Sequence, residues 1–282
     1  MPGLAIFAHD VDLSGIAQAL GMAGMRVCTH PQPGAIHLVA YGESVGVIAS
    51  PQELPAMYLN KPLDPKAVLA AVRTAAELIE ARRAVKESKE LLTIATALAI
   101  ERDRTALYRL IVRKLRELTL ADSGTLFTIE GERGREVLRF AIRQTGPQDA
   151  ETFAGGSLAV SDASLAGHVA RSGKPLRFAD VYKDAGAYGL IFDKSFDEES
   201  GYRTKSMLCV PLMSRSGDPA AVLQLVNKKL AFDMPLLSAP IIESGVEPFD
   251  DRDEELICAL AVHAGAALHN VDLMEALLRA KA

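Results

Sequence analysis

The sequence predicts an α+β protein whose main domain is preceded by a small α/β module and a long helix. The chain has 282 residues, which is enough for more than one compact unit. From residue 105 onward, apolar strands follow one another through short turns, with helices before and after them. That order of elements is typical of an antiparallel sheet flanked by helices. We therefore expect four parts: residues 1–65, 66–104, 105–272 and 273–282.

Residues 1–65 are expected to form the small α/β module. The apolar stretches LAIFAH, RVCTH, AIHLVAY and GVIAS read as short strands, and LSGIAQALGMAG reads as a helix. The segment resembles a receiver domain of two-component signalling through Asp10 after the first strand and through Lys61 and Pro62. Tyr41 stands where the resemblance implies a phosphoacceptor aspartate, and the segment is about half the expected length. We predict a truncated, degenerate receiver-like module used for contact, with an unrelated α/β cap as the alternative.

Residues 66–104 are expected to form a linker helix. Leu69, Val72, Ala76 and Ile79 recur at spacings of three and four, and the stretch EARRAVKESKE supplies a charged face. Such an apolar stripe can pair with a second copy as a coiled coil, or it can lie on the domain that follows. Pairing would make the chain a homodimer.

Residues 105–272 contain the elements of the main domain. A helix leads into the strand TLFTIE, a glycine-flanked turn and the strand EVLRFAIRQ. A short helix, SLAGHVARSG, and a polar loop over 182–204 come next. Two apolar strands around RSGD and a closing helix from about Asp250 complete the domain, and residues 273–282 extend that helix.

Composition and charge exclude several classes of function. A net charge of −5 argues against nucleic-acid binding, because phosphate backbones are bound by clustered Lys and Arg. The stretch LLTIATALAI is too short to span a membrane, and the first residues lack a leader pattern. Cys28, Cys209 and Cys258 lie in apolar settings, as buried thiols do in a reducing compartment. We expect a cytoplasmic protein with no membrane partner.

The motifs of common enzymes are not found. His263 and His269 lie six apart on one predicted helix, so they face different ways and cannot share a metal ion. GHVARSGKP has five residues between its glycines, one too many for a phosphate loop. No nucleophile elbow is present either. We predict no catalytic residues, no metal site and no enzymatic activity.

Several motifs in residues 105–272 carry a family resemblance. They are LADSGTLFTIE, LAGHVARSGKPLRFADVY, GYRTKSMLCVPL, and a VNK sequence followed later by FDDRDEE. With them the segment resembles a GAF domain, closest to the regulatory GAF domains of cyclic-nucleotide-regulated phosphodiesterases and of bacterial GAF/HD-type phosphodiesterases. The last motif is the family signature of five residues, filled here by Asn227, Lys228, Phe249, Asp253 and Glu254. We predict a structural role for it, with Lys228 and Asp253 pairing to hold a strand to the last helix.

The resemblance also implies a ligand site beneath the polar loop. Its phosphate would lie at the start of the short helix, where unpaired backbone amides favour an anion. The implied ligand-binding residues are Thr125, Ile142, Arg143, Leu165, Ala166, Asp193, Asp197, Ser200, Thr204 and Gln224. Relatives often carry a Phe–Asp pair where Ile142 and Arg143 stand here, so the charge at the base edge is reversed. A simpler alternative is that Ser200 and Thr204 only cap turns.

The favoured hypothesis is therefore a regulatory signalling protein. Its GAF domain would bind a small molecule, with cyclic AMP or cyclic GMP as a possible regulatory ligand, and would pass the change through dimeric helices to a partner protein. Another nucleotide or an unrelated metabolite stays open as the ligand. The alternative is a ligand-free GAF fold used for dimerisation or protein interaction. A third hypothesis, a GAF-type methionine sulfoxide reductase, would need a reactive cysteine near the site, and Cys209 within a strand is a poor candidate.

Overall fold

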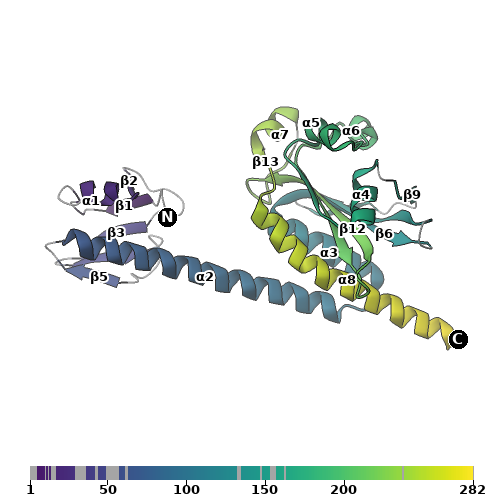
Figure 1. Ribbon diagram of the computed structural model, residues 1–282, viewed down its shortest axis with the longest axis horizontal. Helices are drawn as coiled ribbons and strands as arrows, with labels where there is room; N and C mark the ends of the chain where they lie inside the picture. Colours follow the sequence, from purple (N-terminus) through teal and green to yellow (C-terminus); the bar gives the residue numbers. More distant parts are fainter. Residues whose placement is uncertain are drawn as a thin grey trace. The chain divides into compact units, whose positions relative to one another are not determined.

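The structure is a computed structural model that describes most of the chain. The described residues are 5–9, 11, 13, 17–28, 36–41, 44–48, 57–60, 63–131, 135–146, 148–152, 157–161, 163–236 and 238–281. The chain divides into two compact units, Met1–Glu90 and Leu91–Ala282 (Figure 1). Asp10, Lys61 and Pro62, on which the receiver-like interpretation depends, lie outside the described residues.

The first unit holds a mixed five-stranded sheet in the order β2-β1-β3-β4-β5. Its elements are β1 (Ala5–His9), α1 (Ala17–Met22), β2 (Arg26–Cys28), β3 (Ile36–Tyr41), β4 (Ser44–Ile48) and β5 (Met57–Asn60). The strand β1 runs parallel to β2 and β3, whereas β4 is antiparallel to both β3 and β5. The connections after β3 and β4 are too short for a crossover helix, so those strands reverse direction. The order matches a doubly wound sheet but the directions do not, and the receiver-like identity stays a prediction.

The helix α2 (Pro65–Ile100) contributes to the cores of both units. It begins with Pro at the first helical position, and the carboxylate of Asp64 accepts from the amide of Ala67 at 2.8 Å. Val68 and Val72 are fully buried in the first unit, while Leu98 is buried in the second. The boundary between the two compact units therefore falls inside this helix, after Glu90.

The second unit is built on an antiparallel sheet in the order β10-β11-β12-β6-β7-β8, with β9 and β13 paired to β7 and β12. Its strands are β6 (Ala121–Glu130), β7 (Val137–Thr145), β8 (Ala150–Thr152), β9 (Ser157–Ala159), β10 (Leu176–Phe178), β11 (Met207–Met213), β12 (Pro219–Lys229) and β13 (Val246–Glu247). The predicted α+β arrangement, an antiparallel sheet flanked by helices, is confirmed for this unit.

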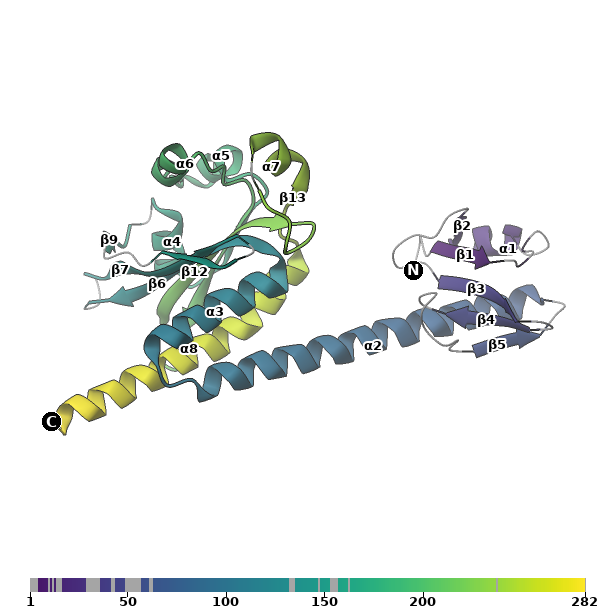
Figure 2. The same ribbon diagram turned by 180° about the vertical axis from the view of Figure 1, so that it is seen from behind.

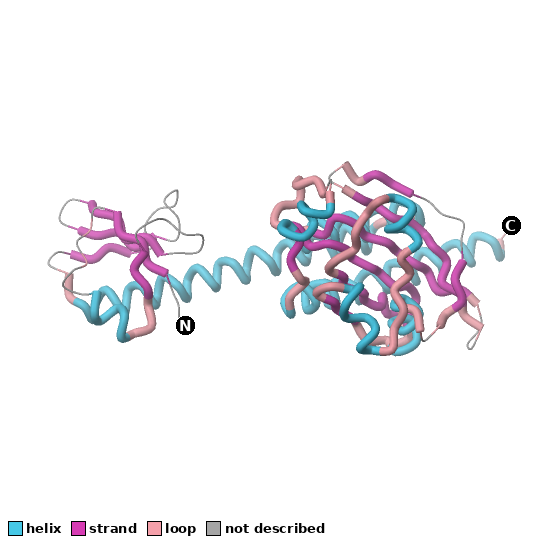
Figure 3. Tube along the Cα trace, turned by 90° about the horizontal axis from the view of Figure 1, so that it is seen from above, coloured by secondary structure: helices cyan, strands magenta, loops and turns pink. Residues whose placement is uncertain are grey.

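The helices of the second unit lie on both faces of its sheet (Figure 2). The helices α3 (Arg104–Thr119) and α8 (Asp251–Ala280) cover one face, and α4 (Leu165–Ser172) packs on the other. The segment predicted as a polar loop is instead largely helical, with α5 (Val181–Asp184), a 3-10 turn (Ala185–Tyr188) and α6 (Ser195–Ser200). A further short helix, α7 (Ala239–Gly245), follows β12. Figure 3 looks down on the sheet from the side of α5, α6 and α7 and shows helices and loops crossing above the strands.

The main core lies between the sheet and the pair α3 and α8. Leu107, Ile111 and Leu115 of α3 are fully buried there, as predicted by their helical spacing. The backbone of α8 contacts the sheet directly, because a Cβ at Gly265 would stand 2.1 Å from the carbonyl oxygen of Met213. Only glycine allows this approach.

The helix α8 is long and apolar enough to cross a membrane by length and composition, but 44% of its apolar window is buried in the domain. Ile257, Leu260 and Ala264 belong to the core described above. In this structure α8 is a core helix whose last turns extend beyond the sheet (Figure 1).

Candidate functional site

A cavity of about 260 Å³ lies between the sheet and residues 181–204, hereafter the lid. This volume is far larger than the ~30 Å³ that one water occupies in the liquid, so a small organic molecule fits. The strands β6, β7 and β12 supply its floor and the start of α4 one wall. It is lined by Ser123, Thr125, Phe127, Leu138, Phe140, Arg143, Ser164, Leu165, Ala166, Ile191, Phe192, Asp193, Ser195, Phe196, Asp197, Tyr202, Thr204, Met207, Gln224 and Val226.

The structure brings together eight of the ten residues predicted to bind a ligand. Those in the cavity lining are Thr125, Arg143, Leu165, Ala166, Asp193, Asp197, Thr204 and Gln224. They come from three strands, one helix and the lid, which are far apart in the chain. Gln224 stands opposite Thr125 across the β6–β12 ladder, so both reach the cavity from the same face.

Ile142 is not a cavity residue, which corrects the prediction. It stands opposite Leu126 in the β6–β7 ladder, and both are fully buried in the core on the α3 and α8 side. Successive side chains of a strand point to opposite faces, so Ile142 and Arg143 cannot both contact one ligand.

Ser200 is also outside the cavity. Its hydroxyl donates to the carbonyl oxygen of Phe196 at 2.6 Å and accepts from the amide of Tyr202 at 3.3 Å. It is exposed and ends α6. At this position the alternative interpretation, a serine that satisfies its own turn, is correct.

Asp197 and Thr204 stabilise the fold of the lid by binding each other. One oxygen of the Asp197 carboxylate accepts from the Thr204 hydroxyl at 2.9 Å, and the other accepts from the Thr204 amide at 2.7 Å. The second oxygen also accepts from the hydroxyl of Tyr182 at 2.9 Å. Burial and this neighbouring carboxylate raise the pKa of Tyr182 to about 12. These three side chains form a latch within the lid that joins α5, α6 and the segment leading into β11.

Asp193 and the start of α4 complete the rim. Asp193 accepts from the amide of Ser195 at 2.9 Å, and that bond lowers the pKa of Asp193. The amide of Ile191 donates to the carbonyl oxygen of Ala163 at 2.7 Å and so joins the lid to the segment before α4. The cap residue Ser164 accepts from the amide of Gly167 at 3.1 Å, so one amide at the helix start is already satisfied from within the protein.

Arg143 occupies the cavity with an unusual set of neighbours. Its Nε donates to the hydroxyl of Thr125 at 3.0 Å, and its guanidinium lies 3.9 Å from the centroid of the Phe196 ring. A second aromatic ring, that of Phe140, is 5.5 Å away. Burial lowers the pKa of Arg143, against the opposing effect of the Asp197 charge.

The prediction from sequence missed the aromatic part of the lining. Phe127, Phe140, Phe192, Phe196 and Tyr202 all border the cavity. One signal was available, since Phe127 follows Thr125 by two positions on a strand and shares its face. The aromatic residues of the lid carried no such signal, because the direction in which their side chains point depends on how the short helices of the lid fold.

Tyr202 connects the cavity to a buried charged group on the first strand of the sheet. Its hydroxyl donates to Asp122 at 2.8 Å, and burial, followed by the Asp122 charge, raises its pKa well above the usual value. The other oxygen of Asp122 pairs with Lys229 at 3.1 Å. Asp122 and Lys229 are almost fully buried, and Tyr202 is partly buried.

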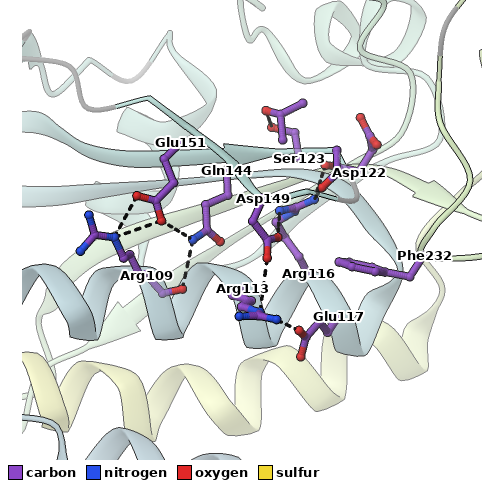
Figure 4. A network of polar contacts seen from close by, with 12 residues as sticks. Arg109, Arg113, Arg116, Glu117, Asp122, Ser123, Gln144, Asp149, Glu151 and Phe232 are labelled. Atoms are coloured by element: carbon purple, nitrogen blue, oxygen red, sulfur yellow. Dashed lines mark hydrogen bonds and ion pairs between the residues drawn. The ribbon is translucent and has the colours of Figure 1, made fainter.

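Arg116 of α3 lies at the same end of the sheet (Figure 4). It is fully buried and donates to Asp149 at 2.7 Å and to the carbonyl oxygens of Asp122 and Gly146 at 2.6 and 2.7 Å. Arg116 therefore joins α3 to the end of the β6–β7 pair at which β6 begins and β7 ends. The sequence pattern of α3 indicated an amphipathic helix but not a buried cation within it.

The five signature residues make contacts inside the domain, and these described residues do not line the cavity. Lys228 pairs with Asp253 at 2.5 Å and with Asp250 at 3.2 Å. Asn227, at a positive φ of 57°, accepts from the amide of Lys205 at 2.7 Å. The remaining contacts are the burial of Phe249 in the core and the approach of Glu254 to Arg177 at 3.7 Å.

The described residues contain no group of three or more His, Cys, Asp or Glu side chains that could hold a metal ion. Burial raises the pKa of the Cys209 thiol to about 12, so it is protonated at neutral pH. A thiol of that kind is a poor nucleophile, which argues against reductase chemistry at Cys209.

Comparison with known proteins identifies the domain. A family model described as GAF domain matches residues 103–268. The dual 3',5'-cyclic-AMP and -GMP phosphodiesterase 11 of Drosophila melanogaster is 29% identical over 179 residues, which cover 58% of this chain and 10% of that protein. The cGMP-specific 3',5'-cyclic phosphodiesterase of the same organism is 28% identical over 211 residues, 72% of this chain and 17% of that protein. The chain thus spans less than a fifth of either relative.

Among solved structures, the GAF domain of a phosphoenolpyruvate-protein phosphotransferase from Coxiella burnetii matches with a TM-score of 0.51 at 18% identity. The match covers 68% of this chain and 98% of that one. At this level of identity the similarity shows a shared fold alone.

Proposed function

Because the chain belongs to the GAF domain family, we propose that it is a regulatory signalling protein whose cavity binds a small molecule. The observation that carries the proposal is the cavity of about 260 Å³ beneath the lid. Its mixture of aromatic and polar lining residues is typical of small-molecule sites. The two Drosophila phosphodiesterases named above are the reason to place cyclic nucleotides first among the candidate ligands.

A cyclic nucleotide is compatible with the lining. Phe127 and Phe140 offer aromatic rings for a flat base, and Thr125 and Gln224 offer polar groups. The start of α4 and the guanidinium of Arg143 both offer positive groups for a phosphate. Cyclic AMP and cyclic GMP are both candidates.

We propose that binding changes the state of the lid and that helices carry the change to a partner protein. The latch of Asp197, Thr204 and Tyr182 fixes the fold of the lid, and the bond from Ile191 to Ala163 joins the lid to the segment before α4. Tyr202 borders the same cavity and reaches Asp122, next to the site where Arg116 anchors α3. A ligand that binds one lid position more tightly than another will shift the equilibrium between those positions by its difference in affinity for them. Pairing of helices between two copies of the chain would pass the shift onward.

The test is ligand-dependent stability. The full chain is heated with cyclic AMP, with cyclic GMP or alone, and we expect at least one of them to raise the unfolding midpoint, as a ligand of the native state must. Ala166→Phe places a ring in the cavity and should abolish the shift. Ala187→Phe makes the same change at an exposed position of the lid and should leave it intact. If neither nucleotide shifts the wild-type midpoint, cyclic-nucleotide binding is wrong for this chain.

One observation favours the second candidate, a GAF fold that acts as a dimerisation module without a ligand. Leu273, Met274, Leu277 and Leu278 are exposed on the last turns of α8. Exposed apolar side chains at helical spacing are typical of a helix that pairs with a partner. Sedimentation of wild type and of Leu277→Glu would then show a dimer that dissociates in the variant and does not respond to nucleotides.

A further inference from the structure

We propose that the ligand of this cavity carries an anionic group, a carboxylate or a phosphate, and that Arg143 on β7 binds it. The inference rests on the proposed function, since it specifies the chemistry of the molecule that the same cavity accepts. It does not depend on that molecule being a cyclic nucleotide.

Arg143 is the one basic side chain in the described lining of the cavity. Two acidic residues share the lining, Asp193 and Asp197. Both are occupied elsewhere: Asp197 accepts three hydrogen bonds in the latch, and Asp193 accepts from the amide of Ser195. Neither forms an ion pair with Arg143 in the described part of the chain.

The guanidinium is held in place with its outer donors unused. Its Nε bond to Thr125 and its contact with the Phe196 ring fix the position of the planar group. The two terminal nitrogens make no hydrogen bond to any described residue. Neither nitrogen is among the buried polar atoms that lack a hydrogen-bond partner, and Arg143 lines the cavity, so a molecule in the cavity can reach them. A guanidinium oriented in this way matches the paired oxygens of a carboxylate or phosphate.

Arg143 differs from two other arginines of the domain, one buried and one partly buried, that pair with a carboxylate. Arg116 pairs with Asp149 at 2.7 Å, and Arg203 pairs with Asp180 at the same distance. A partly buried cation without an acidic partner raises the free energy of the empty protein, because water is replaced by apolar neighbours. An anion bound at Arg143 would remove that penalty.

The remainder of the cavity indicates what else the ligand carries. Phe127, Leu138 and Phe140 lie on the strand side, and Met207 and Val226 add apolar surface. The ligand class is therefore a small anion with a flat or apolar body, such as a nucleotide or an aromatic carboxylate.

The first experiment compares charged probes with neutral counterparts. Wild type is titrated calorimetrically with cyclic AMP, cyclic GMP and 4-hydroxybenzoate, and with adenosine, guanosine and 4-hydroxybenzamide. We expect at least one anion to bind about tenfold or more tightly than its neutral counterpart, since charge-assisted hydrogen bonds are the stronger ones. The 4-hydroxybenzoate titration separates a carboxylate from a phosphate as the recognised group.

The second experiment changes the arginine. Arg143→Gln should raise the dissociation constant of the anion about tenfold or more and leave that of the neutral counterpart unchanged, while Arg143→Lys should fall between them. Arg139→Gln is the control, because Arg139 lies on the same strand, pairs with Glu130 and is not in the lining. Arg143→Met should unfold at the wild-type temperature or above it in the absence of ligand, because it removes an unpaired cation.

The outcomes separate the two proposals. Equal binding of an anion and its neutral counterpart, or an anion affinity that survives Arg143→Gln, overturns the role of Arg143 and leaves the ligand cavity standing. Failure of every probe to bind wild type overturns the proposed function and this inference with it.

Discussion

The carboxylate of Asp197 on α6 accepts hydrogen bonds from both the hydroxyl and the backbone amide of Thr204, at 2.9 and 2.7 Å. Both residues were predicted to contact a ligand, and both do line the cavity. In this structure their strongest hydrogen-bonding groups are used to stabilise the fold of the lid. A ligand that engages Thr204 must therefore compete with Asp197, which makes the latch a natural point at which binding can change the lid.

The latch can be opened by a single side chain. Thr204→Val keeps the shape of the residue but removes the donor to one oxygen of the buried Asp197 carboxylate. We expect the free energy of unfolding to fall by about 1–3 kcal/mol, the usual cost of an unsatisfied buried polar group. Urea denaturation measures the loss, and faster hydrogen exchange over residues 181–204 would locate it in the lid.

Two further variants, Thr204→Ser and Ser200→Ala, check that explanation. Thr204→Ser retains the hydroxyl and should lose clearly less stability than Thr204→Val. Ser200→Ala changes an exposed hydroxyl at the end of α6 and should stay within ~0.5 kcal/mol of wild type. A Thr204→Val protein as stable as wild type would mean that the bond to Asp197 does not hold the lid.

Substitution of Arg116 should lower the free energy of unfolding more than substitution at most other positions of α3. Arg116→Met removes a fully buried guanidinium and leaves Asp149 and two carbonyl oxygens without their donor. Breaking a buried pair on one side costs about 3–5 kcal/mol, so we expect a loss of that order in chemical denaturation.

The matched control lies one turn away on the same helix. Arg113 approaches the same Asp149 at 3.3 Å but is 57% exposed, and exposed pairs contribute ~1 kcal/mol or less. Arg113→Ala should therefore have a small effect. Similar losses at both arginines would contradict the importance given to burial.

Gly167 should not tolerate a side chain. A Cβ at this position would stand 2.2 Å from the carbonyl oxygen of Ser161 and 2.5 Å from the capping hydroxyl of Ser164. Gly167→Ala must displace the start of α4, and we expect a loss of about 1–3 kcal/mol, as for other overpacked sites. Gly186→Ala is the control, because a Cβ there meets nothing within 4 Å. Thermal unfolding of the two variants should differ clearly, and equal midpoints would contradict the close packing at α4.

The hydrogen bonds that cap the start of α8 should make the free energy of unfolding fall at acid pH. The amide of Asp253 donates to Asp250, and this bond, with Lys228 nearby, holds the pKa of Asp250 below its ordinary value of 3.8. A depressed pKa in the folded state means that the stabilisation is complete above the ordinary pKa and is lost as pH falls through the folded value. We expect stability to decline below about pH 4, measured by urea denaturation at successive pH values.

Asp250→Asn isolates that contribution. Asparagine also caps helices well, so α8 should keep its start while losing the titrating group. The variant should therefore show a shallower decline at acid pH than wild type. An unchanged decline would mean that Asp250 contributes nothing to it.

The sequence predicted the second unit well because its signals are local. The apolar spacing in α3 and the stretches that became β6, β7, β11 and β12 depend only on neighbouring residues. The first unit was predicted less well: its strands were found, but the sequence did not show that β4 runs antiparallel to both β3 and β5. The lid was taken for a loop because helices of four to six residues have no clear periodicity.

Eight of the ten residues predicted to bind a ligand line the cavity, and the two errors have physical causes. The prediction placed both Ile142 and its neighbour Arg143 at the ligand. Adjacent residues of a strand point to opposite faces of the sheet, so only one of the two can line the cavity. The Ser200 hydroxyl binds the backbone of its own turn. A serine in a polar segment can always do this instead of contacting a ligand. The partners of Asp122 and Arg116 come from elements far apart in the chain, so no local pattern reveals them.

By itself the sequence determined the elements of residues 105–272, their α+β class and the family resemblance, because periodicity and motif spacing are properties of a continuous chain. Only the tertiary structure decided which polar side chains satisfy one another, as Asp197 and Thr204 do, and which are left facing the cavity, as Arg143 is. The physical reason is that burial and hydrogen-bond pairing depend on which elements meet in space, and for these residues the partners come from separate elements.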